Sequence, residues 1–177
     1  MVRHSLLFLV GLSSSAAAEP RAAPSRLFAD DPGLTLDIGA GAGINDDDMA
    51  TDFDGTHSIA SLLLGYRFHT GTQAFATAGL GVGGHEAIFA SYGAGLRQHV
   101  QLGRFEPFVD AGLYEVGDGQ RLGPALGLGV GVEARIDDRF YVGASANRFF
   151  SADDDEIGGL DWGGRLYVGT RLGASYR

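Results

Sequence analysis

Apolar residues recur at every second position through most of this chain, and this alternation constrains the fold more than any other feature. In LTLDIGAGAGI, residues 34–44, the even-numbered residues are Leu, Ile or Ala and the odd-numbered ones are Thr, Asp or Gly. Residues 160–176 repeat the pattern, with Leu166 and Val168 on one face and Tyr167 on the other. Successive side chains point to opposite faces of a β-strand, whereas a helix has a period of 3.6 residues. The alternation therefore predicts strands.

The alternating runs indicate how many strands to expect. There are eight, at residues 33–45, 57–68, 74–85, 87–102, 105–116, 123–136, 139–150 and 160–176. Several exceed ten residues, which is longer than the five or six of an ordinary strand. The second run is the least regular, because Leu62, Leu63 and Leu64 are consecutive and place Leu63 on the weaker face. With no run of helical spacing beyond the N-terminal segment, we predict an all-β fold with an even number of strands.

The two faces of these strands differ in chemistry. One face is aliphatic and aromatic, and the other carries Gly, Ser, Thr and a few charges. A soluble barrel would turn the apolar face inward, but the other face lacks the Lys and Glu that keep such surfaces soluble. A membrane barrel has apolar residues outside and small or polar residues inside, and its closure leaves no strand edge in lipid. We predict an eight-stranded antiparallel up-and-down transmembrane β-barrel over residues 33–177, with an exported soluble barrel binding an apolar ligand as an alternative.

Glycine is unusually abundant, at 29 of 177 residues, about twice the usual share of roughly 7%. In PALGLGVGVEARIDD, Gly127, Gly129 and Gly131 alternate with Leu and Val. An eight-stranded barrel is barely wide enough inside for side chains, so alternate glycines thin its lumen face and ease its curvature. Residues 79–84 also match a G-x-G-x-x-G dinucleotide pattern. That motif must open a helix, and no helical pattern follows.

The N-terminus predicts export. Residues 1–18 combine one arginine, an apolar run from Leu6 to Leu12 and the alanines at 16–18, which are the parts of a secretory signal peptide. The apolar run is far shorter than the roughly 20 residues of a spanning helix. Residues 19–32 hold three of the five prolines and predict a leader segment before the barrel domain. We therefore expect the mature chain in the outer membrane of the cell.

Charge and cysteine content exclude several classes of site. The net charge of −9 argues against nucleic-acid binding, which needs basic patches. The absence of cysteine rules out disulfides and thiolate metal sites. Acidic residues gather in two segments, at Asp46, Asp47, Asp48, Asp52, Asp54, Asp153, Asp154, Asp155 and Glu156. DFDG at 52–55 is similar to half of a calcium loop but lacks the bidentate Glu at the twelfth position. We expect solvated loops, no metal and no cofactor.

The connections alternate in length. Short links at 69–73, 103–104 and 137–138 alternate with longer ones at 45–56, 116–122 and 151–159, while a short link near 84–87 predicts a tight hairpin. Short periplasmic turns and longer outer loops are typical of membrane barrels. Aromatic residues near the strand ends predict girdles at the two membrane interfaces. They are Phe89, Phe150 and Trp162 at the outer end, and Tyr66, Phe68, Phe140 and Tyr176 at the periplasmic end.

Charged residues on the weaker face predict a network inside the barrel. The acids are Asp37, Glu106, Asp110, Glu133 and Asp161, and the bases are Arg67, Arg97, Arg135, Arg165 and Arg171. Five acids balance five bases. An unpaired charge is costly in a narrow, poorly hydrated lumen, whereas paired and hydrogen-bonded charges are tolerated. We expect a static salt-bridge network that fills the lumen, with a gate controlling a pore as the alternative.

The stretches FEPFVDAGL, GVGVEARIDDRFYVGASA and RLYVGTRLG resemble the small eight-stranded outer-membrane β-barrel proteins of Gram-negative bacteria, of the OmpA-membrane-domain and porin-like surface-antigen type. The resemblance covers about residues 33–177 and concerns architecture. It implies contact with outer-membrane lipid and lipopolysaccharide, insertion by the outer-membrane assembly machinery, and a monomer. Members of this group usually end in an aromatic residue, and here Tyr176 precedes the terminal Arg177.

Enzymes also use this kind of barrel. Lipid A deacylases and palmitoyl transferases are similar barrels whose chemistry needs a serine beside a histidine that an acid orients. VGASANRFF resembles the deacylase stretch at Ser145–Asn147, but Gly143 stands where the deacylase has its histidine, and His57 with Ser58 lacks any further motif. We predict a non-enzymatic protein with a structural, surface-interaction or small-solute-pore role. A lipid A-modifying enzyme is the alternative.

Overall fold

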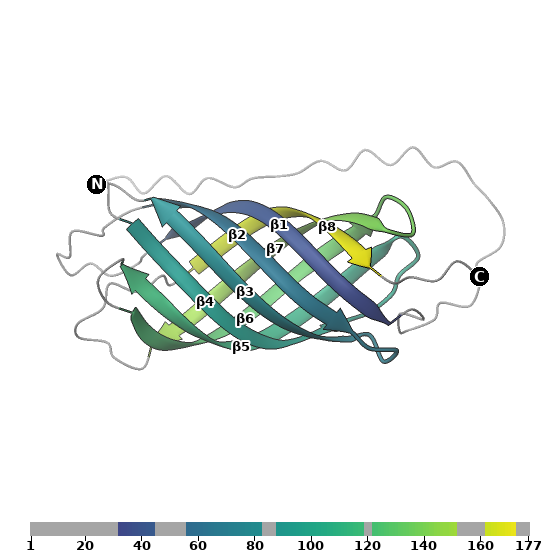
Figure 1. Ribbon diagram of the computed structural model, residues 1–177, viewed down its shortest axis with the longest axis horizontal. Coiled ribbons are helices and arrows are strands. Elements are labelled where there is room, and N and C mark those ends of the chain that lie inside the picture. Colours follow the sequence, from purple (N-terminus) through teal and green to yellow (C-terminus); the bar gives the residue numbers. More distant parts are fainter. Residues whose placement is uncertain (1–31, 45–55, 83–87, 119–121, 152–161, 173–177) are drawn as a thin grey trace, which may run out of the picture.

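A computed structural model describes residues 32–44, 56–82, 88–118, 122–151 and 162–172. These residues form a closed antiparallel barrel in which each strand pairs with its neighbours in the sequence (Figure 1). The strands are β1 (Gly33–Ile44), β2 (Thr56–Arg67), β3 (Thr72–Val82), β4 (Ile88–His99), β5 (Phe105–Asp118), β6 (Leu122–Arg135), β7 (Phe140–Ser151) and β8 (Trp162–Leu172). The predicted eight-stranded, all-β, up-and-down barrel is confirmed.

The barrel closes where the first strand meets the last. Leu34 pairs with Leu172 and Ile44 pairs with Trp162, so β1 and β8 are in register along their whole length. Each strand therefore has a hydrogen-bonded neighbour on both sides, and the backbone groups of the wall bond to one another. Among the described residues, no helix is long and apolar enough to cross a membrane.

The outward face of the barrel is apolar, and the inward face is polar. Leu80, Leu113 and Leu166 point outward and are 66–73% exposed. Their neighbours along the strands point inward, where the carboxyl groups of the described lumen are buried. Leu63 is 1% exposed and lies inside, as the alternation of its strand requires. A surface of this composition matches lipid better than water.

The connections predicted to be short lie together at one end of the barrel, on the right in Figure 1. They join β2 to β3, β4 to β5 and β6 to β7. The longer link predicted over 116–122 is wrong, because β5 extends to Asp118 and β6 begins at Leu122. Gly71 and Gly103 adopt φ angles of 76° and 66°, which residues with a Cβ rarely adopt. In the third turn, backbone N–H groups of Phe140 and Arg139 donate to the Asp137 carboxylate at 2.8 and 2.7 Å. These bonds lower the pKa of Asp137 below its usual value.

Several predicted features fall outside the described residues. They are the signal peptide, the leader segment, both acidic loops and the tight hairpin near 84–87. The predicted strand over 87–102 proves shorter, because β4 ends at His99. The N–H of Leu102 instead donates to the carbonyl of Phe105 across the turn, at 2.8 Å.

The inward glycines lie where other groups of the molecule come close. A Cβ on Gly127 would lie 2.4 Å from the ring of Tyr114, and a Cβ on Gly41 would lie 1.9 Å from the carbonyl oxygen of Gly164. The narrow lumen therefore leaves no space for a side chain at these positions, as the glycine pattern predicts. Residues 79–82, which carry part of the G-x-G-x-x-G pattern, lie inside the antiparallel strand β3 rather than in a loop before a helix.

Candidate functional site in the barrel lumen

Glu106 is the point where three arginines from different strands meet. Its carboxylate, at the start of β5, is fully buried. It accepts hydrogen bonds from Arg67 of β2, from Arg135 of β6 and, at 2.7 Å, from Arg171 of β8. These strands lie at different places around the barrel, so the contacts cross the lumen near the short turns.

Glu133 of β6 extends this cluster towards β4 and β5. Its carboxylate accepts from Arg67 at 2.8 Å and from Arg97 at 3.4 Å, and the Tyr167 hydroxyl donates to it at 3.2 Å. Arg97 also donates to Asp110 through two nitrogens, at 3.0 and 3.1 Å. One connected chain of ion pairs therefore runs from Glu106 to Asp110.

Aromatic rings fill the space around these charges. The Tyr141 hydroxyl donates to Asp37, whose other oxygen lies 3.9 Å from Arg97. The Arg97 guanidinium lies 3.9 Å from the centre of the Phe108 ring. A guanidinium over an aromatic face is attracted by the ring electrons. Ion pairs and rings together pack this half of the lumen.

His99 and Gln73 complete this cluster, although the sequence analysis did not include them. The His99 ring lies 3.0 Å from an Arg67 nitrogen, and its Nε2 lies 3.1 Å from the Gln73 carbonyl oxygen. Gln73 also donates to Thr35 at 2.6 Å. His99 has an odd number on β4, as Arg97 does, and the alternation of this strand therefore predicts that both side chains face the lumen.

One group of side chains has the spacing of a metal site. Ligand atoms of His99, Glu106 and Glu133 lie within 4.8 Å of one another. The Arg67 guanidinium bonds to both carboxylates and lies against the His99 ring. Because Arg171 adds a second positive charge at Glu106, these ligands already hold cations of the protein itself, and we infer no metal centre here.

The structure joins most of the predicted lumen charges. Asp37, Arg67, Arg97, Glu106, Asp110, Glu133, Arg135 and Arg171 are connected by the contacts above. Asp161 lies outside the described residues. Arg165 lies in the lumen but forms no ion pair with a described carboxylate. Its Nε donates to the Ser145 hydroxyl at 3.2 Å, and its guanidinium lies 4.7 Å from the centre of the Tyr167 ring.

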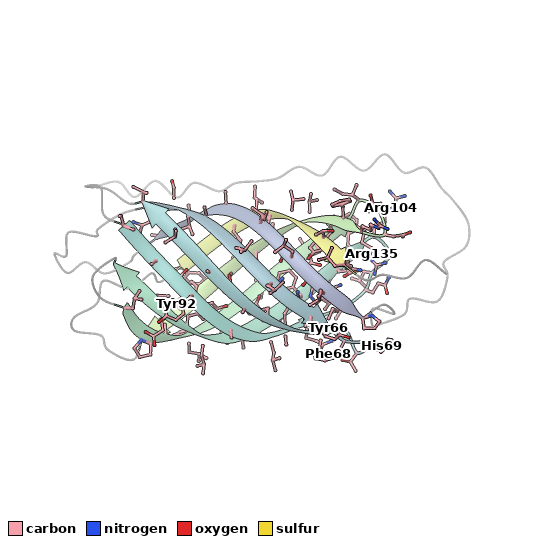
Figure 2. All side chains as sticks on the ribbon, in the orientation of Figure 1. Tyr66, Phe68, His69, Tyr92, Arg104 and Arg135 are labelled. Carbon is pink, nitrogen blue, oxygen red and sulfur yellow. The ribbon has the colours of Figure 1, made fainter. Side chains whose placement is uncertain are left out.

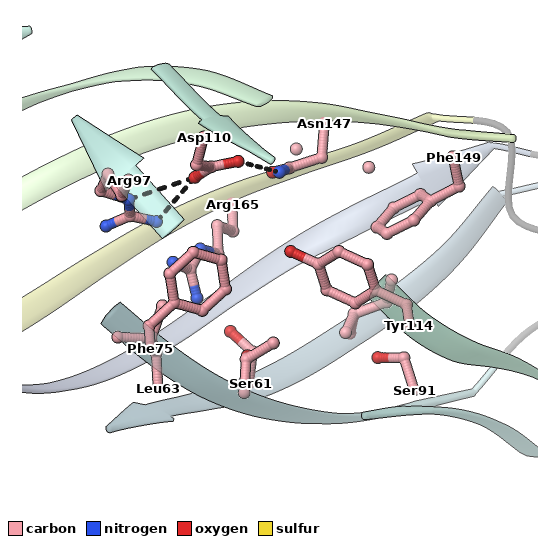
Figure 3. Close-up of a pocket in the computed structure, with 14 residues that line it drawn as sticks. Ser61, Leu63, Phe75, Ser91, Arg97, Asp110, Tyr114, Asn147, Phe149 and Arg165 are labelled. Carbon is pink, nitrogen blue, oxygen red and sulfur yellow. Dashed lines mark hydrogen bonds and ion pairs between the residues drawn. The ribbon is translucent and has the colours of Figure 1, made fainter. Parts of the chain in front are cut away.

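A cavity borders this network on its loop side (Figure 3). Its empty volume, including the opening, is about 600 Å³. Its polar wall contains Arg97, Asp110, Asn147, Arg165 and four hydroxyl groups, while Ile59, Leu63, Phe75 and Phe149 form its apolar wall. The lumen thus holds the ion-pair network near the short turns and a cavity nearer its middle.

Aromatic side chains mark both ends of the outward face. Five of the predicted interface aromatics lie among the described residues, and their side chains are 42–48% exposed: Tyr66, Phe68, Phe140, Phe150 and Trp162. Figure 2 shows Tyr66 and Phe68 at the turn end. Arg148 lies between two aromatic rings on the outside, 5.1 Å from the ring centres of Phe150 and Trp162.

For two predicted interface aromatics, Phe89 and Tyr176, the described residues do not include the side chain. Tyr176 lies outside the described residues. On β4 the even-numbered residues face outward, and Phe89 occupies an odd-numbered position whose side chain is outside the description. Tyr92, which is 51% exposed near the loop end (Figure 2), is an outward aromatic of this strand that the sequence analysis missed. Like the outward Leu96, it has an even number in this strand, and the alternation therefore predicts that it faces outward.

The sequence matches no protein-family model and no curated protein. Solved structures do match. Neisserial surface protein A is 13% identical, with coverage of 80% of this chain and 96% of that chain and a TM-score of 0.57. The N-terminal β-barrel domain of Pseudomonas aeruginosa OprF is 15% identical, with coverage of 79% and 98% and a TM-score of 0.57. The chain has the fold of the small outer-membrane β-barrels. Yersinia pestis outer membrane protein Ail is 15% identical, with coverage of 80% and 100% and a TM-score of 0.51. The predicted resemblance is confirmed for the fold.

Proposed function

We propose that this chain is a non-enzymatic outer-membrane β-barrel protein with a closed lumen and a structural or surface-interaction role. The observation that supports it is the network at the turn end. Arg67, Glu106 and Glu133 are 0–1% exposed there and are surrounded by aromatic rings. An eight-stranded barrel has little interior space beyond its own side chains. A filled cross-section favours a closed barrel over a small-solute pore.

The outer surface supports a place in the outer membrane. An apolar band with aromatic residues towards its rims suits contact with outer-membrane lipid and lipopolysaccharide. The same surface argues against an exported soluble barrel, whose outward face would be polar. With the signal peptide predicted over residues 1–18, we propose export, insertion by the outer-membrane assembly machinery and function as a monomer.

The lumen also argues against the enzyme alternative. Ser145 faces inward and accepts a hydrogen bond from Arg165, which cannot act as a base because a guanidinium stays protonated. A Cβ on Gly143 would lie 2.3 Å from the Tyr167 ring, so the position has no room for histidine. His57 is buried while Ser58 is exposed on the opposite face. None of these serines has the nucleophile and base arrangement that acyl transfer needs.

Conductance of the refolded protein in planar bilayers tests the closed lumen. We expect no steady current, and circular dichroism of the same protein preparation in lipid vesicles serves as the control for insertion of folded barrels. A steady current, or stepwise opening at constant voltage, would contradict the closed lumen and favour the gated pore.

Two further measurements test the membrane location and the absence of enzyme activity. Cell fractionation should recover the protein with membranes until detergent is added, and recovery in the soluble periplasmic fraction would contradict the membrane proposal. Lipid A mass spectra should be the same with the wild-type chain and with Ser145→Ala. Acyl-chain changes that vanish in the variant would support the enzyme instead.

A further inference from the structure

Arg165 stands apart from the other arginines of the described lumen. The arginines there are Arg67, Arg97, Arg135, Arg165 and Arg171, and the carboxylates are Asp37, Glu106, Asp110 and Glu133. Every carboxylate has at least one arginine of the network within 4.0 Å, and none of these is Arg165. Among the described residues, Arg165 therefore has no carboxylate partner within ion-pair distance. Its side chain is only partly exposed, and a partly desolvated guanidinium favours a nearby anion.

The Arg165 guanidinium borders the lumen cavity, and hydroxyl groups line the wall near it. The Ser61 Oγ is buried and has no hydrogen-bond partner among the described residues. Figure 3 shows the Tyr114 hydroxyl pointing into the same space, with Ser91 beside it. These groups can donate hydrogen bonds to an acceptor that the protein itself does not provide.

Among the described residues of the cavity wall, the carboxylate is Asp110, and it is paired with other groups than Arg165. Asp110 accepts two hydrogen bonds from Arg97 and a third from Asn147, at 3.1 Å (Figure 3). Its oxygens are thus engaged on the network side of the cavity. Gly163 and Gly164 line the cavity next to Arg165, and Gly163, which shares the inward face of β8 with Arg165, has no side chain to occupy this space. The space beside the guanidinium is therefore open.

The chemistry of the cavity walls selects the kind of anion. A guanidinium binds a carboxylate through two parallel N–H···O bonds. The remaining wall is apolar, with Leu63, Phe75 and Phe149 facing the same space, and small-molecule sites commonly combine apolar walls with a few convergent polar groups. We propose that this cavity binds a small organic carboxylate with a compact apolar body, held by Arg165. The proposal requires the barrel but not its placement in a membrane, and because the network closes the turn end the ligand is retained, not transported.

Benzoate and benzamide provide a matched test, because they have the same size and differ in charge. The backbone amide signals of Ser61, Asn147 and Gly164 would be followed by NMR in the refolded, 15N-labelled full chain in detergent micelles. We expect benzoate to shift these signals along a saturable curve, and benzamide to bind at least about tenfold more weakly, since a charged hydrogen-bonded pair is lost. Equal affinity for benzoate and benzamide would overturn the proposal, as would the absence of saturable shifts.

Two arginine variants separate the site from the micelle surface. Arg165→Gln removes the proposed partner, and we expect it to weaken benzoate binding at least about tenfold. Arg148→Gln makes the same change on the outward face and should leave the affinity unchanged. Undiminished binding in Arg165→Gln would refute the assignment to this arginine. If that variant does not refold, the comparison of benzoate with benzamide on the wild-type chain still decides the question.

Discussion

Replacing Glu106 by glutamine tests how much the lumen network stabilises the barrel. Glutamine has nearly the same size, so the change opens no cavity, but it removes the negative charge that three arginines share. Arg67 keeps its bond to Glu133 at 2.8 Å. Arg171 retains only a longer contact with the Glu133 carboxylate, at 3.9 Å. The variant therefore leaves positive charge in the lumen with reduced compensation.

The size of the effect follows from the burial of these partners. Removing one member of a buried ion pair costs about 3–5 kcal/mol, because the other charge stays desolvated. The side chains of Arg67 and Arg171 are 1% and 9% exposed, whereas that of Arg135 is 29% exposed and is partly hydrated. We discount the contribution of Arg135 and expect Glu106→Gln to lower the free energy of unfolding by about 3 kcal/mol, at the lower end of that range.

Urea unfolding in phospholipid vesicles would measure this loss. Trp162 is the single tryptophan of the chain and reports unfolding by fluorescence, with circular dichroism as the second probe. Glu115→Gln is the matched control, because it makes the same change at a half-buried residue of the outward register; we expect less than about 1 kcal/mol there. If the two variants differ from each other by less than about 1 kcal/mol, the network does not stabilise the barrel as argued.

Three other predictions concern the wall and the turns. Val130→Arg places a charge on the outward face at mid-strand and should cost about 2–4 kcal/mol in a bilayer, whereas Val130→Leu should not; unchanged stability of the arginine variant in urea would mean that the faces are inverted. Gly41→Ala should cost about 1–3 kcal/mol because its Cβ meets a backbone carbonyl, while Gly164→Ala, whose Cβ has space, should unfold like the wild type in the same assay. The Asp137 carboxyl should titrate in NMR with a midpoint below its usual 3.8. Because its pKa is lowered in the fold, its stabilising contribution is present above pH 3.8 and is lost as the pH falls through the lowered pKa. A midpoint at or above 3.8 would contradict the observed turn hydrogen bonds.

The strands and their faces were predictable because both depend on local geometry. Leu63 shows this most clearly: its hydrophobicity alone would place it in lipid, yet the alternation of β2 places it in the lumen, where it is buried. Tyr92 and His99 follow the same rule on opposite faces of β4. Residue type alone does not assign either of them to a face, whereas their register in β4 does.

The pairing inside the lumen was not predictable in the same way. Arg67 lies on the least regular strand, yet it reaches Glu106 and Glu133, which belong to strands that do not adjoin β2. Arg165 has the same chemistry and no carboxylate partner among the described residues. The difference comes from the stagger of strands around the barrel, which sets the depth of each side chain and which a pattern along one strand does not contain.

The meeting of three arginines at Glu106 has a consequence for how the barrel assembles. A slip of one residue in the pairing of β2, β6 or β8 would turn Arg67, Arg135 or Arg171 towards lipid. Because these arginines lie near the short turns, close to the membrane interface, each would cost at most about 1 kcal/mol in lipid, but each would also leave the buried carboxylate with a partner missing. Arg171 lies on β8, opposite Thr35 of β1 at the seam that closes last along the chain. We therefore expect insertion intermediates with a slipped strand to reopen and pair again, so that the buried charges ensure the fidelity of barrel closure.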